Sequence, residues 1–127
     1  MTSAVTPAQL LEVARQLCET PAWSAQPWTT RAAALLVRQA VEMWLAQYWQ
    51  ATAPGVAVAS RKAQLLLLND ALTEDAAAEA HATWSQLSHA CHHRVFDLEP
   101  TTGQALQWIA QAERLAGALR RAHSETR

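Results

Sequence analysis

The chain has 127 residues, half of them hydrophobic, so it can bury a core without help from metals or disulfides. Its formal net charge of -1 gives no overall attraction to nucleic acid, and any such binding would depend on a local basic patch. Only three Gly and five Pro interrupt an Ala-rich sequence with one Phe and one Tyr, a balance that favours helix over strand. We therefore expect one all-α domain over residues 1–127, with its core between about residues 7 and 122.

Targeting and redox signals are weak in this sequence. The apolar runs are far shorter than the roughly 20 residues of a membrane span, and no signal-peptide pattern is present, so we expect a cytoplasmic protein without membrane contact. Cys18 and Cys91 lie within helical apolar patterns and in no recognised disulfide or zinc spacing. We expect both to pack as small buried hydrophobic residues.

The first predicted helix begins at Thr6, where Thr6, Pro7 and Gln9 supply an N-cap hydroxyl, a proline at the first helical position and a capping-box glutamine. Pro21 ends this helix, and a short connection with two exposed aromatic candidates follows. The apolar side chains recur at steps of three and four residues, which predicts one buried face. That face consists of Leu10, Val13, Ala14, Leu17 and Cys18.

The second predicted helix runs from about Thr30 to Thr52 and stops at Pro54-Gly55. Its apolar stripe continues over the whole length, so we expect it to be the central helix of the core. The stripe consists of Val37, Val41, Trp44 and Tyr48, widened by Leu36, Ala40, Leu45 and Trp49.

A third, shorter helix is predicted from a Ser60 cap through Leu72. It contains four consecutive leucines, Leu65 to Leu68, which cannot share one helical face. Either this helix is buried on several sides or it borders a second subunit.

The fourth and fifth predicted helices complete a four- to five-helix up-and-down bundle. The fourth begins at Thr73, with Glu74 and Asp75 at the positive end of the helix dipole, and ends near Arg94. The fifth begins at the capping-box pattern of residues 101–104 and frays after Ala122. The predicted buried stripes are Ala80, Trp84, Leu87 and Cys91 in the fourth helix, and Trp108, Ile109, Ala112, Leu115, Ala116 and Leu119 in the fifth.

The densest polar cluster lies at the end of the fourth helix. Helical spacing places its histidines on neighbouring positions, so their side chains can converge. Imidazole is the side chain that ordinarily titrates nearest neutrality, which suits proton transfer, metal ligation or pH sensing. The candidate site residues are Ser88, His89, His92, His93 and Arg94.

Three interpretations of this cluster are open. The histidines can cap the C-terminus of the helix and bind the following connection. They can instead contact phosphate or transfer protons together with Arg94, as in a metal-independent ribonuclease. His89 and His93 also have the i, i+4 spacing of helical metal ligands, but no acidic or Cys pair upstream completes a ligand set. We therefore expect a site without a metal or cofactor.

Six tryptophans in 127 residues suggest aromatic contacts beyond the core. Three follow the predicted buried stripes, and three are candidates for a groove or a dimer contact. The first group is Trp44, Trp84 and Trp108, and the second is Trp23, Trp28 and Trp49. The basic pairs Arg61-Lys62 and Arg120-Arg121 are able to touch phosphates, but such short charge runs are usually solvated surface.

The segment from Thr30 to Trp49 resembles the long helix of HEPN-superfamily domains, in which an Ala-rich start leads to a core of Gln, Ala, either Val or Ala, and Glu. The matching residues here are Arg38-Gln39-Ala40-Val41-Glu42. The order of the elements that follow is also similar: a shorter helix, a second long helix ending in a histidine-bearing polar segment, and a closing helix. The likeness covers roughly residues 28–122.

The resemblance implies a four-helix core, frequent dimerisation and, in many members, metal-independent RNA cleavage by an Arg and a His separated by four to six residues. In this chain no Arg precedes a His at that spacing; Ser88 or His89 stands at the arginine position, and His92 or His93 matches the histidine. Members that lack the motif serve as RNA-binding, scaffold or partner-binding modules.

The resulting expectation is a HEPN-like homodimer that binds or cleaves RNA in a bacterial defence, toxin–antitoxin or regulatory setting. If it is an enzyme, it is a metal-independent endoribonuclease. The alternative is a module for dimerisation or for binding a protein partner, without nuclease activity.

Overall fold

The computed structural model describes residues 4–92 and 98–125. These residues form seven helices and no strand, which confirms the predicted all-α fold. Two of the helices, α2 (Pro21–Ser24) and α4 (Pro54–Ala57), are single turns that begin at prolines. The five longer ones are α1 (Pro7–Glu19), α3 (Thr29–Thr52), α5 (Arg61–Ala71), α6 (Glu74–Cys91) and α7 (Thr102–Glu125).

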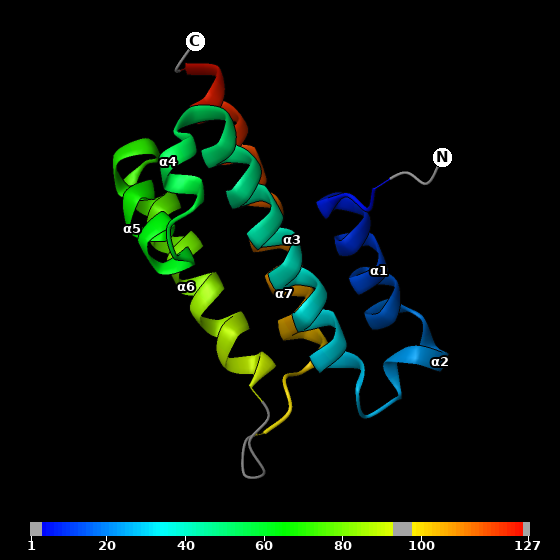
Figure 1. Ribbon diagram of the computed structural model, residues 1–127. Helices are drawn as coiled ribbons and strands as arrows, with labels where there is room; N and C mark the ends of the chain where they lie inside the picture. The colour runs from blue at the N-terminus through cyan, green and yellow to red at the C-terminus, as the bar shows by residue number, and fades with distance from the viewer. Residues whose placement is uncertain (1–3, 93–97, 126–127) are drawn as a thin grey trace.

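The helices α1, α3, α6 and α7 alternate in direction, which gives an up-and-down bundle (Figure 1). The two longest, α3 and α7, have 24 residues each and pack against one another along the middle. On one side α1 packs on both of them, and on the other side α6 does so, with α5 beside it (Figure 1). None of the helices in the described chain combines the length and the apolar character that crossing a membrane requires.

The helix starts follow the caps that the sequence predicts. The Thr6 hydroxyl accepts from the backbone N–H of Gln9 at 3.2 Å, and the Gln9 side chain accepts from the Thr6 N–H at 2.9 Å, which completes a capping box. The hydroxyls of Ser60, Thr73 and Thr101 each accept a hydrogen bond from the backbone N–H three residues later. Each cap satisfies an N–H group that the helix itself leaves unpaired, typically stabilising the helix by about 1 kcal/mol.

The helix ends differ in places from the predicted ones. α6 stops at Cys91, short of Arg94, because His92 leaves the helical conformation with φ -88° and ψ 109°. α7 continues to Glu125 instead of fraying after Ala122. Pro21 and Pro54 each begin a new helical turn, since the first position of a helix tolerates the missing N–H of proline.

The buried residues of the five longer helices form one hydrophobic cluster, and most of the predicted stripes belong to it. Val37, Val41 and Leu45 of α3 are completely buried, as is Ile109 of α7. In α1 the buried face is rotated from the predicted one, because Leu11 is buried whereas Val13 is 47% exposed. The sequence of α1 contains two adjacent rows of apolar residues. Packing against α3 buries the row that contains Leu11.

Cys18 lies on the buried face of α1 and packs in the core as predicted. Burial raises the pKa of its thiol, and the neighbouring Glu19 carboxylate raises that pKa further. The thiol therefore stays neutral, as a small hydrophobic core residue requires.

The four consecutive leucines divide between two faces of α5. Leu65 and Leu68 are buried in the core, whereas Leu66 is 53% and Leu67 is 40% exposed. Burial of the helix on several sides within one chain is thus wrong. A second subunit over Leu66 and Leu67 stays a prediction.

The tryptophans also divide between the core and the surface. Trp108 is buried, and Trp23 and Trp28 are exposed with ring centres 6.0 Å apart, all as predicted. Trp49 was predicted both as part of the apolar stripe of α3 and as a candidate for a groove or dimer contact, and it is buried with the stripe. Because α4 and α5 pack back onto α3, they cover the end of α3 that carries Trp49.

Replacing Leu45 with alanine should lower the free energy of unfolding by roughly 2–5 kcal/mol, because it leaves a cavity at the centre of the core. Leu35→Ala is the matched control, since Leu35 lies on the same helix and is 47% exposed. We expect that control to change the free energy of unfolding by about 0.5 kcal/mol or less. Urea denaturation measures both, and equal losses would contradict the central position of Leu45.

Candidate functional site

Two of the predicted site residues line the same cavity. His89 lies in the last turn of α6, His92 is the residue that caps this helix, and both border a cavity of about 520 Å³. The cavity lies at one end of the bundle, where α6 ends and α3 and α7 begin. Its other polar lining residues are Arg31, Ser85, Gln86, Glu99 and Gln104.

A guanidinium group lies on the wall of this histidine cavity. The Nε of Arg31 donates to Oε1 of Glu99 at 3.0 Å, and the Thr30 hydroxyl lies 3.5 Å from the other carboxylate oxygen. The pair connects the start of α3 to the segment before α7. Because it is partly exposed, this ion pair adds little to stability. It uses the Nε–H of Arg31, one of the five N–H donors of a guanidinium group.

The apolar wall of the cavity is formed around Trp108. Its indole N–H donates to Oε1 of Gln86 at 2.9 Å, which connects α7 to α6 and fixes the orientation of the Gln86 amide. Leu98 and Pro100 add apolar surface at the rim. An apolar wall with a few fixed polar groups is the usual composition of a small ligand site.

Of the other three predicted site residues, only Ser88 lies in the part of the chain that the structure describes, and it does not line this cavity. The hydroxyl of Ser88 is buried and has no hydrogen-bond partner among the described residues. It lies one turn beyond Trp84 on α6, a helix that packs on α3. His93 and Arg94 fall outside the described residues.

The backbone at the end of α6 supports the capping interpretation of the histidines. The N–H of His92 donates to the carbonyl oxygen of His89 at 3.2 Å, which tightens the last turn of α6. Their side chains border the cavity as well, so the two residues take part in both the helix end and the cavity wall.

In residues 4–92 and 98–125 no three His, Cys, Asp or Glu side chains gather closely enough to hold a metal ion. The predicted i, i+4 pair of His89 and His93 lies partly outside these residues. The donors that line the histidine cavity are suited to hydrogen bonding and proton transfer.

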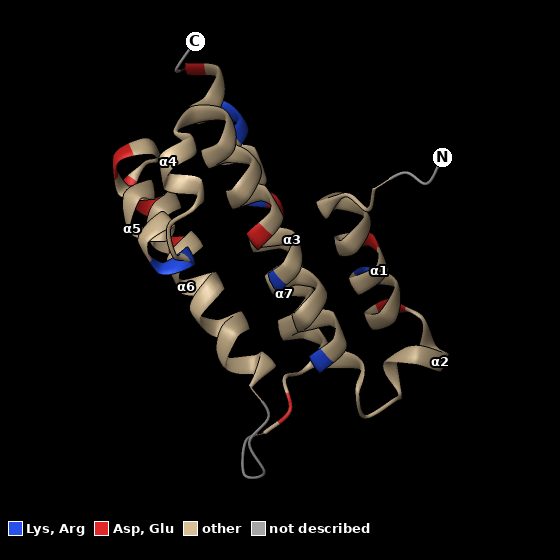
Figure 2. Cartoon of the chain, viewed as in Figure 1, with Lys and Arg blue, Asp and Glu red and all other residues tan. Residues whose placement is uncertain are grey.

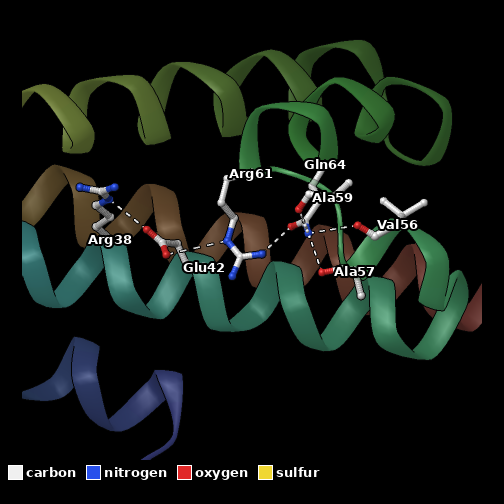
Figure 3. Close-up of polar contacts among 7 residues, drawn as sticks. All are labelled: Arg38, Glu42, Val56, Ala57, Ala59, Arg61 and Gln64. Carbon is white, nitrogen blue, oxygen red and sulfur yellow. Dashed lines mark hydrogen bonds and ion pairs between the residues drawn. The ribbon is translucent and has the colours of Figure 1, made fainter.

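A second polar cluster joins α3 to α5 (Figure 3). Arg38 donates from Nε to Oε1 of Glu42 at 2.9 Å, and the Nε of Arg61 lies 3.8 Å from the other oxygen of this carboxylate. The guanidinium carbon of Arg38 also lies 5.7 Å from the centre of the Trp84 ring on α6. Arg61, which the sequence suggested as surface charge or a phosphate contact, is thus partly buried in an ion-pair network.

Gln64 extends this network into the protein interior. Its side-chain oxygen accepts from Nη1 of Arg61 at 2.7 Å, and the residue is completely buried. Its amide nitrogen lies within 3.2 Å of three backbone carbonyl oxygens, those of Val56, Ala57 and Ala59 (Figure 3). Sequence reasoning missed Gln64, although its place one residue before Leu65 puts it beside the buried row of α5.

The network also concerns the segment that resembles HEPN domains. Two of its residues, Arg38 and Glu42, are engaged in joining α3 to α5 and α6. Comparisons with protein-family models, with curated proteins and with solved structures found no match for the chain. The resemblance therefore rests on the sequence of residues 28–122 and on the order of the helices.

Replacing Gln64 with leucine should lower the free energy of unfolding by about 1–3 kcal/mol, because buried carbonyl groups lose their donor. Gln39→Leu serves as the control, since Gln39 is exposed on α3. Chemical denaturation of the two variants and the wild type gives the comparison. A Gln64→Leu protein as stable as the control would show that these carbonyl contacts contribute nothing.

Proposed function

We propose that this chain is a HEPN-like helical protein that binds RNA at the histidine cavity beside the end of α6. The observation that supports this proposal is that His89 and His92 border the same cavity as Arg31. Imidazolium and guanidinium groups donate charge-assisted hydrogen bonds to phosphate oxygens. The amides of Gln86 and Gln104 add groups that hydrogen-bond to the edge of a base.

The size and charge of the cavity favour a short single-stranded segment. A volume of about 520 Å³ admits one unstacked nucleotide more readily than a duplex, whose bases stay inside the helix. Basic and acidic segments are interspersed along the described helices, without one continuous basic stripe (Figure 2). Binding through so few cations should depend only weakly on salt concentration, because few counterions are released.

The same cavity is where RNA cleavage would take place if the protein is an enzyme. One imidazole would accept the proton of the attacking 2′-hydroxyl, and the second would donate a proton to the leaving oxygen. His89 and His92 are the two histidines of the predicted set that the structure describes. The other predicted site residues are Ser88, His93 and Arg94. A defence, toxin–antitoxin or regulatory setting belongs to the same proposal and comes from the resemblance, whereas the cytoplasmic location comes from the sequence pattern.

Binding is tested with a fluorescently labelled single-stranded RNA and measured by anisotropy. The double variant His89→Ala/His92→Ala should bind at least roughly tenfold more weakly, because two charge-assisted donors are lost. His81→Ala is the control, since His81 is exposed on α6 and does not line the cavity. Equal affinity of the double variant and the control would exclude the cavity as the RNA site.

Cleavage is tested on the same RNA in the presence of a chelator. If the wild type cleaves the RNA and His89→Ala/His92→Ala does not, metal-independent cleavage is assigned to these two imidazoles. Equal cleavage by both proteins, or none by either, would remove the enzyme claim and leave binding to stand by itself.

A second candidate function, a homodimerisation module without nuclease activity, is favoured by the exposed leucines of α5. Leu66 and Leu67 are consecutive residues of α5 that are 53% and 40% exposed, and exposed large apolar side chains are typical of an interface. In this candidate the face of α5 that carries them meets a second copy of the chain.

Light scattering coupled to size exclusion tests this candidate. The wild type should elute as a dimer, and Leu66→Gln/Leu67→Gln should raise the monomer fraction because the apolar contact is lost. Val58→Gln is the control, since Val58 is 89% exposed but lies outside α5. A wild type that remains monomeric at high concentration would rule the candidate out.

A further inference from the structure

The short helix α1 covers only part of the groove between α3 and α7. Each of these two helices has 24 residues and is therefore about 36 Å long, whereas α1 has 13 residues and is about 20 Å long. α1 lies beside the N-terminal halves of α3 and α7, and the opposite halves extend beyond its start (Figure 1). About 16 Å of the groove, or some eleven helical residues, is left without a third helix.

The uncovered part is a concave surface of about 300 Å³, here called the open groove. Its base is apolar and includes the small side chains of Ala51 and Ala116, which allow the backbone of another helix to approach closely. The open groove is lined by Trp44, Gln47, Tyr48 and Ala51 from α3 and by Ala116, Leu119, Arg120 and His123 from α7.

α1 shows which kind of element fits such a groove. It fills its own part with one row of small and medium apolar side chains, Leu11, Ala14 and Cys18, spaced three and four residues apart. The open groove is formed by the same two helices further along their length. A helix with a similar apolar row is therefore the element that its shape suits.

The charges around the open groove indicate the polar face of this helix. Arg120 and His123 line the groove, and no Asp or Glu is among its lining residues. The acids Asp70 and Glu125 line a separate cavity together with Trp49. α1 also has no acid in its first turn, so apart from the neutral Thr6–Gln9 capping box no carboxylate of α1 opposes the positive end of its dipole. A partner with negative charge is complementary to all of these features.

We propose that the open groove docks an acidic amphipathic helix of a protein partner, lying end to end with α1. The apolar row of the partner packs against the base of the groove, and its carboxylates face Arg120 and the start of α1. This surface is separate from the histidine cavity, which lies at the opposite end of α3, and the inference does not depend on RNA binding.

The probe is a synthetic helical peptide of about 12–15 residues with Leu or Ala along one face and Glu on its flanks, titrated into the full chain by calorimetry. A second peptide with Lys in place of Glu tests the charge requirement. We expect the acidic peptide to bind at least roughly tenfold more tightly than the basic one, because several carboxylates meet a positive rim.

Matched substitutions locate the contact. Ala51 is exposed on α3, so Ala51→Glu and Ala51→Lys should both fold. Ala51→Glu should weaken binding of the acidic peptide, and Ala51→Lys should leave that binding unchanged. Arg120→Glu should weaken binding, and Arg120→Lys should preserve it. Ala78→Glu is the control, since Ala78 is exposed on α6 outside the open groove. Unfolding midpoints of all variants establish that they are folded.

Five outcomes would overturn the inference, four with the peptides and one with the free chain. The first four are no binding of either peptide at about millimolar concentration, equal binding of both peptides, unchanged binding to Ala51→Glu and Arg120→Glu, and displacement of the acidic peptide by single-stranded RNA. Dimerisation that Ala51→Glu abolishes would assign the groove to a second copy of the chain and would also overturn it. None of these results depends on His89 or His92.

Discussion

The packing of α3 against α7 is the constraint on which the rest of the molecule depends. Both helices present alanines to the core, and Ala33, Ala34, Ala40, Ala105 and Ala112 are completely buried. Small side chains let two helices approach closely, so these 24-residue rods form a stiff central pair. Every other long helix except α5 packs on both of them, and both candidate binding surfaces lie along this pair.

The mismatch in helix length explains where these surfaces occur. At one end, α6 stops at Cys91 and the chain returns to α7, so polar side chains from three helices surround the histidine cavity. At the other end, α1 has not yet begun, and α3 and α7 form the open groove, whose residues Tyr48, Ala116 and Leu119 are buried beside the exposed Arg120. In a bundle whose helices all had the same length, a third helix would cover the open groove. Here the unequal lengths leave two regions of opposite character, one lined by histidines and amides and the other by apolar and cationic side chains.

The polar network around Gln64 shows how the shorter helix α5 is held on this framework. Gln64 satisfies carbonyl groups of the turn that precedes α5, while Arg61 reaches Glu42 on α3. Buried polar groups of this kind contribute mainly by specifying one arrangement, because leaving any member unpaired is costly. The network also gives Arg38 and Glu42, the first and last of the five residues that match the HEPN pattern, a structural role that is independent of any chemistry with RNA.

The sequence by itself determined the helices, because caps and apolar periodicity act over a few neighbouring residues. Helices begin at the predicted caps, which are Thr6, Ser60, Thr73 and Thr101. Most of the predicted apolar stripe of α3 is buried. Only the tertiary structure decided which apolar row of α1 is buried, that Trp49 is covered and that Gln64 lies inside. It also brought Arg31 to the same cavity as His89 and His92, although they are more than 50 residues apart. Such relations depend on contacts between helices far apart in the chain, and local spacing contains no information about them.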